Sequence, residues 1–274
     1  MLKPLIAALL LIAIPAAAQQ TCTPRLAPPV LTEAGRLSMS INPTLPPMQF
    51  VDLSGQLRGL NVDLGNEIAR RLCLEPSYVR IDFNAMVPGL QSRRWDVINT
   101  GIFWTEERSR IMFLVNYGSQ AVSVMTLSGN PLNIRVPDDL AGRTVSVETG
   151  TYAERRLREF SAEFERKGLR PVTIRAFNTG AEGYQALRAG QVQASMSIDT
   201  TAAEVTRRTG LHWALRGIGG APIAFAAAQR PLAEAIATAM NEIREDGTYA
   251  RIFAQYGFSE LTEVTFAING PGPR

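Results

Sequence analysis

The stretch "LNVDLGNEIARRLCLEPSYVRIDFNAMVPGLQSRRWDVIN", residues 60–99, decides the fold of this chain. Its first part repeats an apolar residue every four positions, which is the stripe of an amphipathic helix: Leu60, Leu64, Ile68 and Leu72. Asn61 or Asp63 is placed to cap the start of that helix. A strand over Val79–Phe83, a short helix over Met86–Leu90 and a strand over Trp95–Asn99 follow. This alternation predicts an α/β fold with a mostly parallel sheet and helices on its faces.

The residues on either side extend the same pattern. A strand is expected over Arg36–Ile41, followed by a loop at Asn42–Pro47, because three prolines there oppose both helix and sheet interior. After residue 140 strands and helices alternate again. The expected elements are the strands Arg143–Glu148, Val172–Phe177 and Val192–Ser197 and the helices Thr151–Lys167, Ala181–Ala189 and Thr200–Arg208.

A glycine-rich break then separates this second unit from two final helices. Gly217–Pro222 is expected to be a hinge or loop, because glycine and proline interrupt regular structure. Apolar residues line one face of a helix after it, and a last helix is expected over Thr248–Gln255. We predict two lobes joined near Tyr117–Met125 and again near Gly219–Ala227, with a ligand cleft between them.

The chain boundaries follow from this division and from the N-terminal composition. Met1-Leu2-Lys3 is a basic start, Leu5–Ile14 is apolar, and Ala16–Ala18 offers a cleavage site, which together predict a secretory signal peptide over residues 1–18. The apolar run is shorter than the ~20 residues that a membrane-spanning helix needs. We expect the first lobe at 19–119, the second at 120–221, and a return to the first lobe at 222–274.

Export would determine whether the two cysteines, Cys22 and Cys73, form a disulfide. In an oxidising compartment the two can pair and tie the mature N-terminus to the body of the protein. The alternative is two separate thiols, with Cys73 buried at a helix end. The compartment favours the bridge.

The bulk composition excludes several classes of protein. Apolar residues make up 46% of the 274 residues, which is enough to bury a core, and the formal net charge of +3 is too small to indicate a nucleic-acid or membrane-surface partner. The single histidine, His212, cannot build a zinc site or a His-paired nucleophile without other groups. With no phosphate-binding loop or cysteine cluster, we expect no metal and no cofactor. These eliminations favour a binding protein over an enzyme, although carboxylates could still supply acid and base.

Four segments, in order, resemble one family. They are "NPTLPPMQFVDLSGQLRGLNVDLGNEIARRL" (42–72), "FNAMVPGLQSRRWDVINTGIFWTEERSRIMFLVNYG" (83–118), "LAGRTVSVETGTYAERRL" (140–157) and "EIREDGTYARIFAQYG" (242–257). Together they resemble the family 3 extracellular solute-binding proteins, which feed amino acids to ABC transporters. The resemblance implies a type II two-lobe periplasmic binding fold and a periplasmic monomer. It also implies a receptor that closes by a hinge on a small ligand and docks on a membrane ABC permease.

The resemblance also implies which residues hold the ligand's α-carboxylate. Arg108 matches the arginine that forms a forked pair with this group, a role that the paired donors of a guanidinium suit. It lies just after the Thr100–Phe103 segment, whose backbone N–H groups near Ile102 and Phe103 would share the carboxylate. From the second lobe, the Thr151 hydroxyl and the Tyr152 N–H would close on it at a helix start, where free N–H donors favour an anion. Thr149 or Thr151 could equally cap that helix, and both roles can hold together.

An acid should receive the ligand's ammonium group, and Asp199 is the candidate. The usual family position falls on Ile198, one residue earlier, and a shift of one residue on a strand turns a side chain to the other face. A loop at the strand end could restore the orientation. Otherwise Asp199 is the N-cap of the next helix.

Four further positions indicate what kind of side chain the ligand carries. The loop aromatic that usually stacks on the ligand is Leu45 here, and the small hydroxyl residue of the central loop is Phe103. Phe83 fits the other stacking position, and Glu148 stands where the family often has glutamine. Because Leu45 and Phe103 make the pocket more apolar, we expect an amino acid or small carboxylate with a neutral or apolar side chain.

Two alternative functions remain open on the same scaffold. One is an enzyme such as a cyclohexadienyl or arogenate dehydratase, with Glu148 or Asp199 as the acid in the cleft. The other is a sensor module that binds ligand without taking part in transport.

Overall fold

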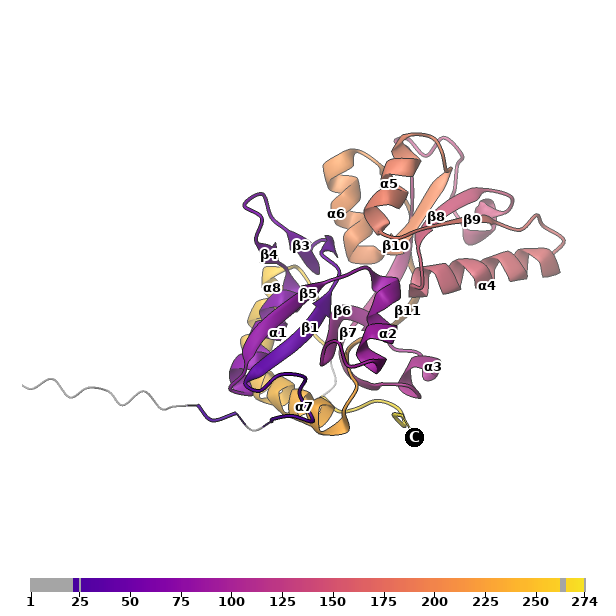
Figure 1. Cartoon of the computed structure of the whole chain (residues 1–274). Coiled ribbons are helices and arrows are strands. Elements are labelled where there is room, and N and C mark those ends of the chain that lie inside the picture. The colour runs from indigo at the N-terminus through magenta and orange to yellow at the C-terminus, as the bar shows by residue number, and fades with distance from the viewer. Residues whose placement is uncertain (1–21, 25, 262–264, 274) are drawn as a thin grey trace, which may run out of the picture.

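The computed structural model describes residues 22–24, 26–261 and 265–273, so the expected signal peptide at 1–18 lies outside the described residues. Within these ranges eight strands form one curled sheet in the order β5-β1-β6-β11-β7-β10-β8-β9, and three short strands form a second sheet. Figure 1 shows two lobes, with the strands β7 and β11 lying between them. The predicted α/β two-lobe fold is confirmed.

The first lobe carries parallel strands flanked by helices. Its elements are β1 (Arg36–Ile41), β5 (Glu75–Arg80), β6 (Val97–Phe103), α1 (Leu60–Arg71), α2 (Phe83–Gln91) and α3 (Glu106–Ser109). A small antiparallel sheet of β2 (Thr44–Leu45), β3 (Gln49–Val51) and β4 (Leu57–Arg58) projects from it (Figure 1). The α1 stripe is buried as its four-residue period predicts, because Leu60, Leu64 and Ile68 face the core.

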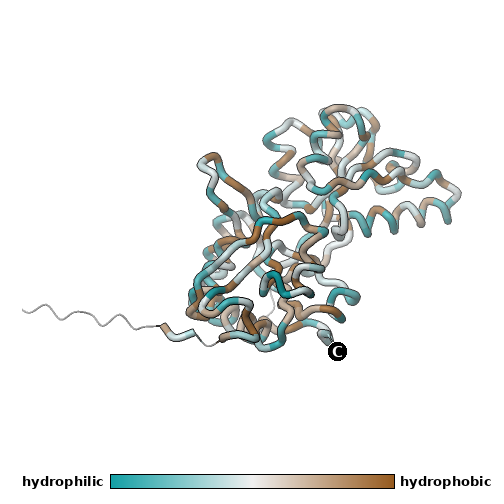
Figure 2. Tube along the Cα trace, in the orientation of Figure 1, coloured by the Kyte–Doolittle hydropathy of each residue, from teal (hydrophilic) through white to brown (hydrophobic). Residues whose placement is uncertain are grey.

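The second lobe repeats the arrangement. Its elements are β8 (Thr144–Glu148), β9 (Thr173–Phe177), β10 (Ala194–Ile198), α4 (Tyr152–Arg166), α5 (Gly180–Arg188), α6 (Asp199–Thr209) and the 3-10 helix η1 (Pro137–Leu140). β8 pairs with β9 and β10 in parallel. Figure 2 shows polar and apolar residues alternating along α4, which buries Leu157, Phe160 and Phe164 and exposes its charged face.

Two long strands, β7 (Phe113–Thr126) and β11 (His212–Ala227), run antiparallel between the lobes. β11 pairs with β6 in the first lobe, and β7 pairs with β10 in the second. The expectation that Gly217–Pro222 is a loop is wrong, because these residues lie inside β11. Gly217 and Gly219 have positive φ and the register shifts around Ile218, so the strand absorbs the glycines as bulges.

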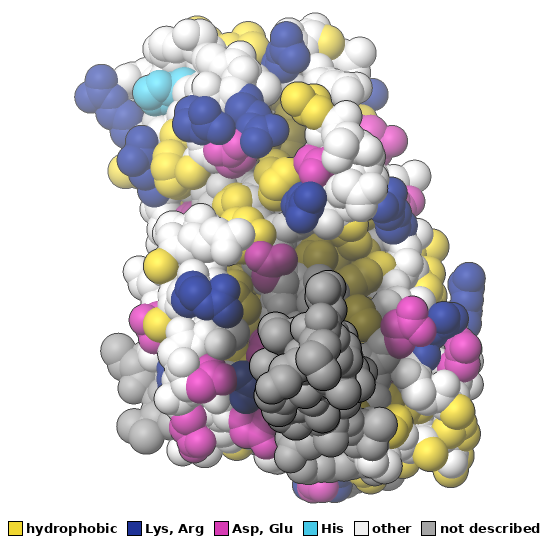
Figure 3. Space-filling model, turned by 90° about the vertical axis from the view of Figure 1, so that its left-hand side faces the viewer, with side chains coloured by type: hydrophobic (Ala, Val, Ile, Leu, Met, Phe, Trp, Pro, Cys, Tyr) yellow, Lys and Arg dark blue, Asp and Glu magenta, His cyan; other side chains and the backbone are white. Residues whose placement is uncertain are grey.

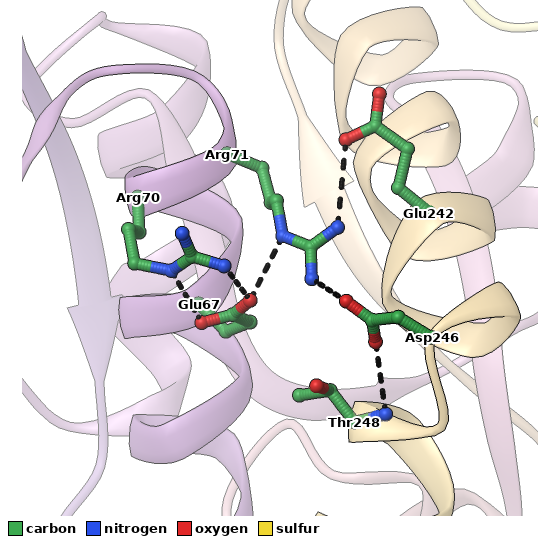
Figure 4. A network of polar contacts seen from close by, with 6 residues as sticks. All are labelled: Glu67, Arg70, Arg71, Glu242, Asp246 and Thr248. Carbon is green, nitrogen blue, oxygen red and sulfur yellow. Dashed lines mark hydrogen bonds and ion pairs between the residues drawn. The ribbon is translucent and has the colours of Figure 1, made fainter. Parts of the chain in front are cut away.

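The chain returns to the first lobe through α7 (Arg230–Glu245) and α8 (Thr248–Gln255), both of which pack against α1. Figure 4 shows the polar contact that joins α1 to the end of α7. Arg71 pairs with Glu67 on its own helix at 2.9 Å and with Asp246 and Glu242. The Thr248 N–H, which donates to Asp246, and after it the guanidinium of Arg71 lower the pKa of Asp246 to about 2.

Some local boundaries differ from the expectations. The α1 cap is Gly59, with no side-chain cap, so neither Asn61 nor Asp63 caps this helix. Gly59 can take this place because its φ is +127° and a Cβ there would lie 2.4 Å from the Met48 carbonyl oxygen. The proline-rich loop includes the two-residue strand β2, and the strand expected at Val79–Phe83 is β5, which ends before Phe83 opens α2.

A disulfide joins the N-terminal segment to the first lobe, as we expected for an exported protein. Cys22 and Cys73 form a disulfide with a Cα–Cα distance of 5.4 Å. Cys73 directly follows α1 and has a φ of +57°. In the part of the chain that the structure describes, no helix has the length and apolar character of a membrane span.

Candidate functional site

The carboxyl ends of the strands in both lobes face one another across a cleft with two hollows. An inner cavity of about 40 Å³ is lined by Leu45, Phe83, Thr100, Phe103, Glu148 and Met196, among others. An outer groove of about 310 Å³ is lined by Phe83, Thr105, Arg108, Gly150 and Arg155, among others, and Thr151 and Tyr152 line both hollows. Figure 3 shows hydrophobic side chains in the recess between the upper and lower halves of one face.

An aromatic pair joins the two lobes at this cleft. Phe103 from the first lobe stacks on Tyr152 from the second, with ring centroids 4.4 Å apart and planes inclined by 11°. The Tyr152 hydroxyl also donates to the Gly219 carbonyl of the crossing strand β11 at 2.9 Å. Both residues line the inner cavity, so the stacked pair forms part of its wall where the lobes meet.

Arg108 lies where the lobes meet. It belongs to α3, whose N-cap Thr105 accepts a hydrogen bond from the Arg108 N–H at 3.1 Å. Its guanidinium donates to the Phe103 carbonyl at 3.0 Å and, across the cleft, to the Gly150 carbonyl at 3.1 Å. It also lies 5.4 Å from the centre of the Phe83 ring. Burial, with a smaller effect from the charge of Arg155, lowers the pKa of Arg108 to about 10, so it stays cationic at neutral pH.

Thr100 is oriented by a chain of buried hydrogen bonds within the first lobe. The Tyr117 hydroxyl donates to the side-chain oxygen Oδ1 of Asn61, and the side-chain amide of Asn61 donates to Gln49 Oε1 at 2.6 Å. The Gln49 amide in turn donates to the Thr100 hydroxyl oxygen at 2.6 Å. Because the Thr100 hydroxyl oxygen accepts this bond and Thr100 lines the inner cavity, its own proton can be donated to a ligand there.

Glu148, at the end of β8, is the buried acid of the cleft. It is 6% exposed and accepts a hydrogen bond from the Asn42 amide of the first lobe at 2.6 Å. Burial raises the pKa of Glu148 to about 8, although the bond from Asn42 works against this shift and the charges of Asp82 and Glu182 add to it. The carboxyl group is therefore mostly protonated at neutral pH.

The second lobe also presents the start of α4. Thr151 is its N-cap and accepts from the Glu154 N–H at 3.3 Å, so the capping prediction is confirmed. The Thr151 hydroxyl donates to the Glu148 carbonyl at 2.7 Å. A helix start of this kind offers N–H donors and a positive dipole end to an anion in the groove.

Asp199 lies outside the residues that line either hollow. It is the first residue of α6, after the N-cap Ile198, which itself lines the inner cavity. The Asp199 carboxylate accepts hydrogen bonds from the Ser123 hydroxyl on β7 and from the Gly217 N–H on β11, at 3.3 Å for the latter. In this conformation the acid joins α6 to both crossing strands.

The structure therefore brings Leu45, Phe83, Thr100, Phe103, Glu148, Thr151 and Tyr152 around the inner cavity and Arg108 beside it. The sequence reasoning missed Asn42 and the Gln49–Asn61 pair. Asn42 directly follows β1, and a polar residue at the carboxyl end of a strand is a signal that could have found it. Among the described residues, no group of three or more His, Cys, Asp or Glu side chains is placed to hold a metal ion.

Comparisons with known proteins identify the family. The family model described as bacterial extracellular solute-binding proteins, family 3, matches residues 37–260. The arginine-binding protein ArgT of Corynebacterium glutamicum is 29% identical over 85% of this chain and 78% of its own length. The L-cystine-binding protein TcyJ of Escherichia coli is 25% identical over 84% of this chain and 86% of its own. A solved ancestral arginine-binding protein bound to arginine superposes with a TM-score of 0.75 at 28% identity, covering 81% of this chain and 98% of that one.

Proposed function

The chain belongs to the bacterial extracellular solute-binding proteins, family 3, and on that premise we propose that it is a periplasmic receptor for an amino acid. The receptor binds the amino acid or a related small carboxylate, closes its lobes around it, and delivers it to an ABC permease in the membrane. It works as a binding protein and not as an enzyme.

The position of Arg108 carries this proposal. Its guanidinium donates to carbonyl oxygens of both lobes, at Phe103 and Gly150, and so lies where a ligand would touch both. A carboxylate accepts a stronger, charge-assisted bond than a carbonyl does, and the helix start at Thr151 adds N–H donors from the other side. A ligand that makes both sets of contacts only in the closed state drives closure by its differential affinity.

The second part of the proposal is a ligand with a neutral or apolar side chain. Leu45, Phe83, Phe103 and Met196 give the inner cavity a mostly apolar wall. Its buried acid, Glu148, has a pKa of about 8 and is thus mostly neutral at pH 7, when it can exchange hydrogen bonds with an uncharged group. The ammonium group would go to an acid, either Asp199 after a turn away from Ser123 or Glu148, which the positive charge of the ammonium group would ionise.

The proposal also covers the lobe boundaries, the oligomeric state and the cellular compartment. We take residues 1–18 as a cleaved signal peptide, 19–119 with 222–274 as the first lobe, and 120–221 as the second. The mature protein would act as a monomer in the periplasm, where the Cys22–Cys73 bridge is stable.

Thermal unfolding of the mature chain against the twenty amino acids tests the proposal. Ligand at 100 times its dissociation constant adds ~2.7 kcal/mol of stability, which gives a clear rise in melting temperature. We expect the largest rises with neutral or apolar amino acids. Rises with only Lys, Arg or Glu would refute the side-chain assignment, and formation of product from prephenate or arogenate would replace the receptor by a dehydratase.

A further inference from the structure

The family match ends at residue 260, but the described chain continues along the first lobe as a C-terminal tail, residues 265–273. The tail is anchored at Phe266, which is 4% exposed and meets the Tyr249 ring edge-on at 5.3 Å. The Asn241 side chain donates to the Phe266 carbonyl at 3.0 Å and accepts from its N–H at 2.7 Å. Phe266 therefore fixes the place from which the last residues start.

Beyond this anchor the tail covers an edge of the sheet. In the first lobe the strand order is β5-β1-β6-β11-β7, so β7 is the outermost strand there. Ile268 forms an antiparallel bridge with Val115 of β7, and the Asn269 N–H donates to the Leu114 carbonyl at 2.8 Å. Pairing an outermost strand in this way satisfies backbone groups that would otherwise face solvent.

The tail then forms hydrogen bonds with the short segment Trp104–Ser109, which carries Arg108. The Trp104 indole N–H donates to the Asn269 carbonyl at 3.1 Å, just before α3. The Gly272 N–H donates to the Ser109 carbonyl at 2.8 Å, at the end of α3. The two bonds therefore hold this segment on both sides of Arg108. Figure 1 shows the C-terminus beside α3.

Two glycines allow this close approach. A Cβ at Gly270 would lie 2.4 Å from the Cβ of Ser109, and one at Gly272 would lie 2.1 Å from the Phe113 ring. Their φ angles of +104° and +74° also disfavour any other residue. The absence of a Cβ at these two glycines thus lets the tail backbone pack directly against Ser109 and Phe113.

The need for such a support follows from the length of α3. A helix of four residues has no stability of its own, because nucleation alone costs more than one turn returns. Its position depends on the Thr105 cap and on contacts made from outside. We propose that residues 268–273 are a positioning strap that holds the Trp104–Ser109 segment so that Arg108 faces the cleft. The part of this proposal that concerns the ligand rests on the proposed function, in which Arg108 takes the carboxylate.

A shortened chain that ends at Ala267 tests the strap. It keeps the Phe266 anchor and removes the residues that touch β7 and α3. Hydrogen–deuterium exchange without ligand should be faster in the amides of residues 104–112 than in the full chain, with little change in the second lobe. Calorimetric titration with L-leucine, L-glutamine and L-arginine should show about tenfold weaker binding of any probe that the full chain binds, ~1.4 kcal/mol.

A point variant distinguishes the loss of the strap contacts from a general loss of stability. Gly272→Ala places a methyl group against Phe113 at a φ of +74°, whereas Gly168→Ala at +73° meets nothing within 4 Å. Both substitutions carry the same backbone strain, so only Gly272→Ala should speed exchange at 104–112 and weaken binding.

The outcomes distinguish the two proposals. Unchanged exchange at 104–112 in the shortened chain overturns the strap, and so does faster exchange with undiminished affinity. If the full chain binds none of the three probes or the other amino acids, the proposed function fails, while the exchange comparison still decides whether the tail holds α3.

Discussion

The two walls of the cleft differ in where their polar groups find partners. On the first-lobe wall, Thr100 is oriented by Gln49, and Gln49 by Asn61, all within one lobe. On the second-lobe wall, the carboxyl group of Glu148 accepts its hydrogen bond from Asn42 of the opposite lobe. Thr100 therefore keeps its partner when the lobes part, whereas Glu148 loses one, and Arg108 loses its bond to the Gly150 carbonyl while it keeps the one to Phe103.

This difference indicates which wall receives the ligand first. A buried polar group without a partner costs free energy. The carboxyl group of Glu148 is therefore stable either in the closed protein, where it bonds to Asn42, or in contact with water. Thr100 needs no such change, and Arg108 keeps its first-lobe bond to the Phe103 carbonyl, so the donor that it withdraws from Gly150 is free for a carboxylate. We expect ligand to dock on the first lobe and the second lobe to close on it.

The largest expected effect comes from removing the cation of the first wall. Arg108→Ala should weaken ligand binding by ~1.5–3 kcal/mol, roughly 10- to 150-fold, which is the range for hydrogen bonds to charged groups. The reason is that the carboxylate would lose a fork of donors in a partly dry cleft. Titration calorimetry with the best amino acid from the thermal screen measures the change.

Arg110→Ala is the matched control, because Arg110 lies two residues away, is exposed and pairs only locally with Glu106. It should leave affinity unchanged, since an exposed pair of this kind contributes little. Equal affinities for both variants would show that the carboxylate is held elsewhere.

A pH-dependent effect is expected from the acid of the second wall. Burial raises the pKa of Glu148 from 4.5 to about 8, so between these values the folded chain holds a proton that the unfolded chain releases. Stability from this group is thus fully present below pH 4.5 and is lost as the pH rises to about 8. The slope is at most ~1.4 kcal/mol per pH unit, and hydration of an opened cleft reduces it.

Urea unfolding of the wild type and Glu148→Gln at pH 5, 6.5 and 8 measures this contribution. The wild type should lose stability relative to the variant as the pH rises, and Glu165→Gln, at an exposed position on α4, should follow the wild type. Parallel curves for the wild type and Glu148→Gln would mean that Glu148 is hydrated and ionised, and that the second wall is as independent as the first.

The sequence predicted the features that depend on local periodicity. The apolar stripe of α1 and the repeated strand–helix alternation determine which faces of the helices and strands are buried. Packing of these faces forms the core of each lobe. The disulfide followed from the number of cysteines and their compartment. The resemblance then named eight of the residues that line the two hollows of the cleft.

Other features could not be read from the sequence because they join distant segments. The Asn42–Glu148 bond spans 106 positions, and the Trp104–Asn269 bond spans 165. Glycines in Gly217–Pro222 looked like a break, yet pairing with β7 keeps them within a strand. The orientation of Asp199 likewise depends on Ser123, which lies on another element.

The smallest expected effect compares two helix caps within the second lobe. Thr151 caps α4 and lines both hollows of the cleft, whereas Thr179 caps α5 and lines neither, and each accepts from the N–H three residues later at 3.3 Å. Either Thr→Ala change should cost ~1 kcal/mol of unfolding free energy, the usual value of such a cap. Only Thr151→Ala should also weaken ligand binding, because Thr151 lines the groove and its cap holds the start of α4 there. Urea unfolding and calorimetry on both variants separate the two contributions. An equal loss of affinity would mean that the second wall acts on the ligand only through the stability of its lobe.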